Sequence, residues 1–352
     1  MSNIRKPPVK QTDTDSRAIE RTAAVRLFAL LGSARGLLAL LAVLVIGFFY
    51  SPKTVSGWPM FLTVETQTSA LYEIASVGLM AVGMTFVILT GGIDLSVGSV
   101  MGLVAMVFSL LYIKLGWGPV ASACVSLVVG ACCGAVNGTL VTKLRLQPFV
   151  ATLAMMASAR GVAQLLTDSK SIVAGPGKAF AAGADIPLYS WMNSSILGTG
   201  LRPITMLFVL VAVAGMIVIK YSRLGRQLYA IGGNEQAARL SGVSVDTAKI
   251  SAYVICGVTA ALAGICDAAK TGYGFPMSGF TMELDAIAAV VIGGTSLMGG
   301  SGSMFLTLIG TVLIADISKL LSLNNVQPAS RLLAKGALIV AAVLIQQRRS
   351  KR

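Results

Sequence analysis

The sequence predicts an all-α, polytopic membrane protein with about ten transmembrane helices and both termini in the cytoplasm. Of the 352 residues, 55% are hydrophobic and 12% are charged, whereas about a quarter of the residues of a soluble protein are charged. The apolar residues form blocks of about 17–25 residues, the length that crosses a ~30 Å hydrocarbon layer. Lysine and arginine gather between these blocks, which favours a topological origin for their excess.

The spans are predicted in order along the chain. Residues 1–35 are polar and basic but contain Asp13, Asp15 and Glu20, which is not typical of a signal peptide, so they are predicted to form a cytoplasmic tail. The run GLLALLAVLVIGFFY is then an uncleaved first span. Spans are predicted at 36–50, 70–90, 96–115, 118–141, 149–168, 204–221, 249–269, 283–300, 302–321 and 330–346. They make a membrane domain of residues 36–346, followed by a basic tail of residues 347–352.

The two spans between residues 283 and 321 leave two alternatives. They must cross the membrane twice in about 39 residues. Either the turn at GGSGS (299–303) is very tight, or the first of the two is a broken half-span. Gly293 and Gly294 lie inside that first span and would permit the break.

Basic residues set the expected orientation. With the N-terminus inside, the cytoplasmic segments carry 18 of the 28 lysine and arginine residues and the outer segments carry 9, while Arg160 lies within a span. This twofold bias places the polar loop 222–248 in the cytoplasm. The formal charge of +14 is therefore attributed to topology, and no nucleic-acid partner is expected.

Several kinds of chemistry are excluded by residue usage. Histidine is absent, which removes Ser/His and Cys/His catalysis and most transition-metal sites. The five cysteines lie in apolar runs without a Cys-x-x-Cys pair, which favours small hydrophobic packing residues. The only Gly-Lys pair, Gly177-Lys178, is followed by Ala179, so a phosphate-binding loop cannot form. The chain is therefore predicted to be no enzyme, with no cofactor and no metal.

The stretch NEQAARLSG (234–242) is predicted to be one short capped helix. Asn234 can accept from the first free backbone N–H groups. Glu235 lies near the positive end of the helix and can pair with Arg239 one turn later. Gly242 can close the helix in the left-handed conformation. Because so short a helix is marginal in water, we expect it to dock, either on its own spans or on another subunit.

Four stretches together resemble the ribose/xylose-type sugar permeases of ATP-binding-cassette importers. They are GGIDLSVGSV (91–100), PFVATLAMMASARG (148–161), GGNEQAARLSGVSVDTAKISAY (232–253) and ELDAIAAVVIGGTSLMGG (283–300). The third matches the cytoplasmic coupling loop of such permeases, and the likeness runs from about residue 70 to the C-terminus. The stretch NNVQPASRLLAKG (324–336) departs from the aromatic-containing sequence expected there, which leaves the substrate subgroup open.

The resemblance implies a function and a set of partners. Such a permease forms the pore of a bacterial inner-membrane importer, works by alternating access and takes up a monosaccharide or related small polyol. Its implied partners are a tandem-domain cytoplasmic ATPase, a periplasmic sugar-binding protein, a second permease copy in a homodimer or heterodimer, and the lipid bilayer. The residues assigned to ATPase coupling are Gly233, Asn234, Glu235, Ala238, Arg239 and Gly242.

A second set of polar residues is assigned to the translocation path or its gate. These residues are Asp94, Asn137, Arg160, Gln164 and Thr295. Asp94 follows a span directly, so it either caps the next helix, which starts near Leu95, or acts at a gate. Because sugars are neutral, the hydroxyl-bonding groups of Asn137, Gln164 and Thr295 are expected to line the path.

Arg160 lies about 11 residues into its span, which is roughly 16 Å along a helix. An arginine at that depth needs a partner or water, so it serves either as an ion-pair scaffold or as a path residue. The candidate carboxylate partners are Glu73, Asp267, Glu283 and Asp285.

Two further alternatives remain at the sequence level. GACCGAVNG places Gly130, Gly134 and Gly138 on one helix face, which predicts close helix packing, within the chain or at a dimer seam. For the function, the alternative is an ion-coupled secondary transporter of a small polar solute. That class requires carboxylates or histidines deep in the membrane, whereas the acids here lie near span ends. A membrane-embedded enzyme is the least supported class, because no nucleophile–base pair or metal set is visible.

Overall fold

A computed structural model describes residues 36–175, 180, 186–337 and 340, and the predicted tails 1–35 and 347–352 lie outside these residues. The described part is all-helical, without named strands, as predicted. An unlabelled helix, Gly36–Tyr50, comes first. The labelled helices are η1 (Met60–Leu62), α2 (Val64–Leu89), α3 (Val97–Ser109), η2 (the π-turn Leu110–Lys114), α4 (Pro119–Thr142), α5 (Pro148–Leu165), α6 (Pro187–Asn193), η3 (Ile196–Gly198), α7 (Pro203–Tyr221), α8 (Arg223–Gly233), α9 (Glu235–Leu240), α10 (Val245–Thr271), α11 (Met282–Gly293) and α12 (Met304–Leu323). Residues 328–337 are also helical.

Six helical stretches in the described residues are long and apolar enough to cross a membrane. They are α2, α3 with η2, α4, α7, α10 and α12. Each overlaps a predicted span, and proline explains several boundaries: Pro119, Pro148 and Pro203 each occupy the first turn of a helix, where a missing N–H costs no hydrogen bond. The count of ten spans stays a prediction.

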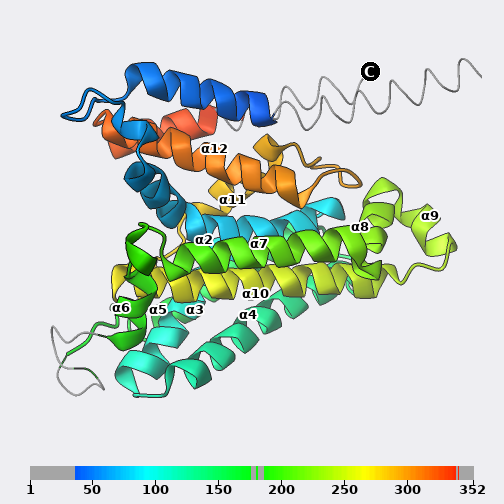
Figure 1. The fold of residues 1–352 in the computed structure, drawn as a ribbon. Helices are drawn as coiled ribbons and strands as arrows, with labels where there is room; N and C mark the ends of the chain where they lie inside the picture. The colour runs from blue at the N-terminus through cyan, green and yellow to red at the C-terminus, as the bar shows by residue number, and fades with distance from the viewer. Residues whose placement is uncertain (1–35, 176–179, 181–185, 338–339, 341–352) are drawn as a thin grey trace, which may run out of the picture.

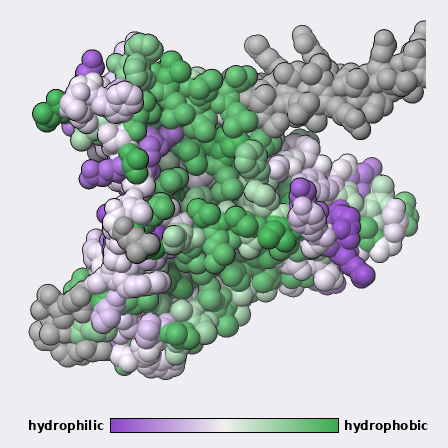
Figure 2. Space-filling view, viewed as in Figure 1, coloured by the Kyte–Doolittle hydropathy of each residue, from purple (hydrophilic) through white to green (hydrophobic). Residues whose placement is uncertain are grey.

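The helices α2, α4, α7 and α10 run side by side, with α6 at one end of the bundle and the α8–α9 pair at the other (Figure 1). Helices α2, α3 with η2, and α10 form the centre: 83%, 78% and 67% of their most apolar windows are buried, against 33% for α7 and 22% for α4. Helices at the rim must therefore meet lipid or a partner. Figure 2 shows an apolar surface over the middle of the bundle, with polar residues toward its two ends.

The seam between α4 and α10 depends on small residues. A Cβ on Gly130 would meet the Gly257 carbonyl group, and a Cβ on Gly134 would meet the Tyr253 carbonyl group. On Gly138 it would lie 2.7 Å from the Cα of Ile250. The close packing predicted from GACCGAVNG is therefore confirmed, and the partner helix belongs to the same chain.

Helix α11 corresponds to the predicted half-span. It has 12 residues, about 18 Å, which is too short to cross a ~30 Å layer. It ends at Gly293, and Gly294 follows with φ of 107°. A Cβ on Gly310 would meet the Ala289 carbonyl oxygen, so α11 packs closely against α12. The broken span is thus the alternative that the structure adopts, and the predicted helix over 283–300 is wrong beyond Gly293.

Candidate functional site

The polar loop 222–248 contains two helices, one more than the sequence suggested. Helix α8 begins after Ser222, whose hydroxyl oxygen accepts from the Gly225 N–H at 3.1 Å. Leu228 and Ile231 are buried, three residues apart on one face of the helix. That apolar spacing, together with the Ser222 cap, is a signal from which α8 could have been predicted.

The predicted caps of α9 are confirmed. The Asn234 side-chain oxygen accepts from the Ala237 N–H at 3.0 Å, and Gly242 has φ of 81°. Within this short helix Ala238 is buried, whereas Leu240 is 90% exposed. Helix α9 thus projects from the bundle with an exposed leucine and little core of its own.

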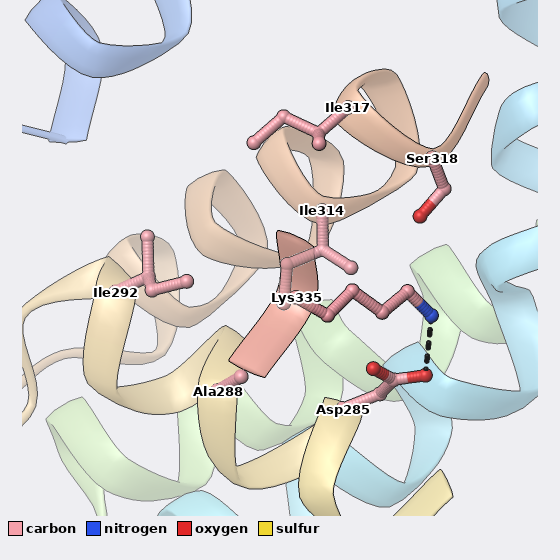
Figure 3. Close-up of a pocket in the computed structure, with 7 residues that line it drawn as sticks. All are labelled: Asp285, Ala288, Ile292, Ile314, Ile317, Ser318 and Lys335. Atoms are coloured by element: carbon pink, nitrogen blue, oxygen red, sulfur yellow. Dashed lines mark hydrogen bonds and ion pairs between the residues drawn. The ribbon is translucent and has the colours of Figure 1, made fainter. Parts of the chain in front are cut away.

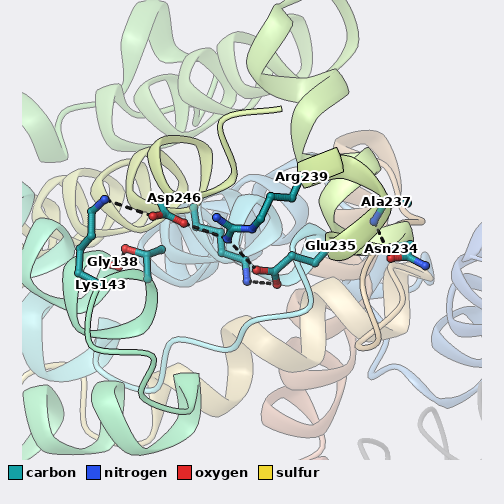
Figure 4. A network of polar contacts seen from close by, with 9 residues as sticks. Gly138, Lys143, Asn234, Glu235, Ala237, Arg239 and Asp246 are labelled. Atoms are coloured by element: carbon teal, nitrogen blue, oxygen red, sulfur yellow. Dashed lines mark hydrogen bonds and ion pairs between the residues drawn. The ribbon is translucent and has the colours of Figure 1, made fainter. Parts of the chain in front are cut away.

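A chain of ion pairs fastens α9 to the start of α10 and the end of α4 (Figure 4). The predicted Glu235–Arg239 pair is present at 3.4 Å. The Glu235 carboxylate also accepts from Lys249 at 2.6 Å, and Asp246 joins Arg239 at 3.1 Å and Lys143 at 3.2 Å. Burial raises the pKa of Glu235, but the bonds and charges of Lys249 and Arg239 outweigh it and lower the pKa below its usual value. Exposed pairs add little stability, so this network mainly orients α9.

The far end of α8 meets the bundle at a glycine junction, defined here as Gly91, Gly232, Gly299 and Gly300. The Gly300 N–H donates to the Leu89 carbonyl at 3.0 Å. A Cβ on Gly232 would collide with the Leu89 oxygen and the Gly300 nitrogen, both backbone atoms. The junction therefore joins α8 to the end of α2 and to the turn between α11 and α12.

Asp94 and Asn137 lie together near the start of α3 and the last turns of α4. The Asp94 carboxylate accepts from the Ser96 N–H at 2.9 Å and from the Ser96 hydroxyl at 2.6 Å. The Asn137 amide donates to the Ser96 hydroxyl at 2.9 Å and lies 3.5 Å from both Asp94 oxygens. Asp94 is buried two residues before Ser96, the N-cap of α3, so its carboxylate fixes the turn at Ser96 and bonds no N–H group inside the helix, which starts at Val97 and not near Leu95.

Two α10 side chains complete this buried cluster. The Tyr253 hydroxyl oxygen lies 2.7 Å from where a Cβ on Gly92 would be, and Cys256 faces Asp94. Both are buried. Neither residue was singled out from the sequence. A tyrosine within an apolar run is nevertheless a signal, because a buried hydroxyl group is usually placed near other polar groups.

Arg160 is held by backbone carbonyl groups. Its guanidinium donates to the Pro276 oxygen at 2.6 Å and the Ser278 oxygen at 2.7 Å, and to the Gly98 oxygen at 3.4 Å. The expected contact with a carboxylate is wrong, because the non-helical segment after α10 presents carbonyl oxygens that helices would have satisfied. Glu283 acts on Arg160 through space only.

Two of the other candidate acids pair elsewhere. Glu73 meets Lys319 at 2.7 Å and Asp285 meets Lys335 at 2.8 Å. Figure 3 shows the second pair at the edge of a small pocket between α11 and α12, with the Lys335 ammonium directed at Asp285. This contact fastens the helical residues 328–337 to α11.

The remaining path candidates occupy two places. The Gln164 amide lies 3.5 Å from the sulfur of Met277. Met277 belongs to the non-helical segment after α10 that Arg160 also contacts. Thr295 is buried in the turn after α11, against Gly302. The structure therefore groups Arg160 with Gln164 and Asp94 with Asn137, and it separates Thr295 from both pairs.

We expect Lys335→Met to destabilise the protein by leaving the Asp285 carboxylate without its cation. The cost should lie between the ~1 kcal/mol of an exposed pair and the ~3–5 kcal/mol of a buried one, since the two side chains are 26% and 18% exposed. Thermal melting of the purified protein in detergent measures the loss. Adding Asp285→Asn should recover part of it, and strict additivity of the two changes would show that the pair contributes nothing.

Comparisons with known proteins agree with these motifs. The family model described as "Branched-chain amino acid transport system / permease component" matches residues 66–343. The ribose import permease protein RbsC of Escherichia coli (strain K12) is 38% identical over 318 residues, covering 90% of this chain and 94% of that protein. The D-allose transport system permease protein AlsC is 34% identical (92% and 94% covered), and the xylose transport system permease protein XylH is 31% identical (88% and 91%), both from the same strain. No solved structure matches the chain.

Proposed function

The chain belongs to this permease family, and from that premise we propose that it is the membrane subunit of an ATP-driven importer for a monosaccharide or related small polyol. The names of its relatives support the substrate class, because those names include ribose, allose and xylose. They do not favour the ion-coupled alternative, because the relatives are import permeases. The particular sugar need not be fixed by this chain, because a binding protein can select it first.

The observation that carries the coupling proposal is the projecting, capped helix α9. Its one turn and a half would be marginal alone, yet its ends are capped and its charges are paired. Leu240 remains 90% exposed at its tip. A separate tandem-domain ATPase would cover that tip, with Gly233, Asn234, Glu235, Ala238, Arg239 and Gly242 forming the docking element.

The proposed mechanism is alternating access. Closure of the ATPase pushes α9, and the rigidly joined α8 transmits that push through the glycine junction to α2 and to the α11–α12 turn. The pore then changes the side to which it opens. ATP can shift this equilibrium only by the difference between its affinities for the two states.

We assign the path residues as two groups. Asp94 with Asn137 forms the inner mouth of the path, where the loop before α3 can serve as a gate, and Arg160 and Gln164 act farther along the path, beginning at the level of Gly98 in α3. Thr295 contributes a hydroxyl group at the turn after α11. These assignments follow from the requirement that a neutral polyol needs hydrogen-bonding groups along its route.

The proposed assembly and orientation complete the function. Both termini and the loop 222–248 face the cytoplasm of a bacterium, with ten spans in its inner membrane. The chain works with a second permease copy and a periplasmic sugar-binding protein. Uptake into proteoliposomes should require the ATPase, ATP and the binding protein together. Uptake that needs only an ion gradient, without the ATPase, would instead identify an ion-coupled transporter.

Orientation can be tested with single cysteines on a background without the five native ones. Gln236→Cys lies in α9 and Lys170→Cys lies at the opposite end of the bundle, and both positions are exposed. A membrane-impermeant thiol reagent on intact spheroplasts should label Lys170→Cys alone. Labelling of Gln236→Cys alone would reverse the topology.

We expect Gly242→Val to lose ATP-driven uptake. The backbone there has φ of 81°, and a Cβ would meet no atom within 4 Å, so the substitution acts through backbone strain of about 1–2 kcal/mol and not through a clash. Pull-down of the ATPase should weaken while membrane insertion stays normal. Gly242→Asn is the matched control, because asparagine tolerates this conformation. If both variants retained full uptake, the closing turn would have no coupling role.

A further inference from the structure

The segment 272–281 between α10 and α11 is non-helical and runs deep into the bundle. At its start, a Cβ on Gly274 would lie 2.7 Å from the Ser109 side chain at the end of α3. Near its end, Gly279 packs against the Gly98 backbone at the start of α3. Those α3 positions are eleven residues apart, about 16 Å along a helix, which is more than half of the 18-residue candidate span that α3 forms with η2.

Irregular backbone at this depth needs its polar groups satisfied. Arg160 supplies two hydrogen bonds, to the carbonyl oxygens of Pro276 and Ser278. At the other end, the Glu283 side chain lies against Gly98, beside the Gly279 carbonyl oxygen. The segment is thus held by the hydrogen bonds of Arg160 from α5 and bordered by Glu283 from α11.

The surface around this segment differs from the lipid-type surfaces of the bundle. Arg160, Gln164 and Glu283 each keep part of their side chain accessible here, next to the exposed rings of Phe275 (40%) and Phe280 (65%). Along α7 from Met206 to Ile217, by contrast, the exposed large side chains are apolar: Met206, Val209, Leu210, Val213 and Ile217. Charged groups and irregular backbone are tolerated at membrane depth against protein or water, not against lipid.

We propose that segment 272–281 is a re-entrant wall of the sugar path, with Phe275 and Phe280 as its substrate-facing surface and Arg160 as the residue that positions it. This inference rests on the proposed function and names the residues that would line the sugar path. Aromatic rings suit the C–H faces of a sugar ring, while the nearby Gln164 amide can bond to its hydroxyl groups. The face then opens on water.

The test compares Phe280→Cys with Leu210→Cys in the reconstituted complex on a cysteine-free background. The two positions are similarly exposed, 65% and 66%. A charged methanethiosulfonate should modify Phe280→Cys at least about tenfold faster, as expected for a thiol in water and not in lipid, and a transported sugar such as ribose should slow it. Equal, slow modification of both thiols, with rapid modification by a lipid-soluble maleimide, would overturn the proposal.

A second measurement tests the contact between Phe280 and the sugar independently of the thiol labelling. Phe280→Ala should lower the maximal rate of uptake about threefold to tenfold, the loss expected for one aromatic contact, and Phe280→Tyr should restore most of it. Leu210→Ala should leave uptake unchanged. An unchanged rate in Phe280→Ala would refute the substrate-facing role. If the unmodified complex, with its native cysteines, shows no ATP-driven uptake of any sugar, the proposed function fails, whereas the labelling contrast tests the wall separately.

Discussion

Replacing Gly232 by alanine is expected to detach α8 from the bundle and to abolish ATP-driven uptake. The added Cβ would collide with the Leu89 oxygen and the Gly300 nitrogen and would lie 3.0 Å from the Gly299 carbonyl carbon. All three are backbone atoms that cannot rotate away. Overpacking of this kind costs about 1–3 kcal/mol, which exceeds the gain of up to ~1 kcal/mol in helix propensity. Uptake into proteoliposomes and thermal melting in detergent measure the two effects.

Gly233→Ala provides the matched control for stability. It lies on the same helix one residue later, and a Cβ there would meet no atom within 4 Å. Its melting temperature should equal or slightly exceed that of the unmodified protein, since alanine favours the helix. If Gly232→Ala melts like Gly233→Ala and supports normal uptake, the junction does not transmit motion from α8 to α2.

Local features of the fold could be predicted from the sequence. The caps at Asn234 and Gly242, the Glu235–Arg239 pair and the break at Gly293 each depend on residues within a few positions of one another. Such features are set by backbone geometry and short contacts, which one sequence displays directly. The close packing at Gly130, Gly134 and Gly138 was also predictable, because small residues four apart form one helix face that a neighbouring backbone can approach closely.

Long-range contacts could not be predicted in the same way. Nothing near Arg160 in the chain shows that its partners are carbonyl groups more than 110 residues later. Helical neighbours would have left a carboxylate as the natural partner of this arginine, but segment 272–281 is not helical and offers free carbonyl groups. The same reason hid the glycine junction, where Gly232 meets residues from two distant turns. Helix α8 differs, since its apolar spacing was visible and was overlooked.

The transport and stability roles of Arg160 can be separated. We expect Arg160→Ala to destabilise the protein strongly, because it leaves the Pro276 and Ser278 oxygens without a donor. Each unsatisfied acceptor costs about 1–3 kcal/mol, and the lost side chain adds a cavity. Arg160→Lys should rescue partly, since one ammonium group can reach both oxygens but lacks the fork that also reaches Gly98. Thermal melting and the yield of folded protein in detergent report the order of the three proteins.

Arg160→Met is the control that separates hydrogen bonding from packing, because methionine restores much of the volume and no donor. It should remain well below Arg160→Lys in stability. Combining it with Asp285→Asn should give additive losses, since Asp285 pairs with Lys335 at 2.8 Å. Combining it with Glu283→Gln should recover some stability, because Glu283 would otherwise keep a half-buried charge without the nearby cation. A stable Arg160→Met protein that fails to transport would mean that segment 272–281 holds its position without Arg160, and that the guanidinium acts in the path itself.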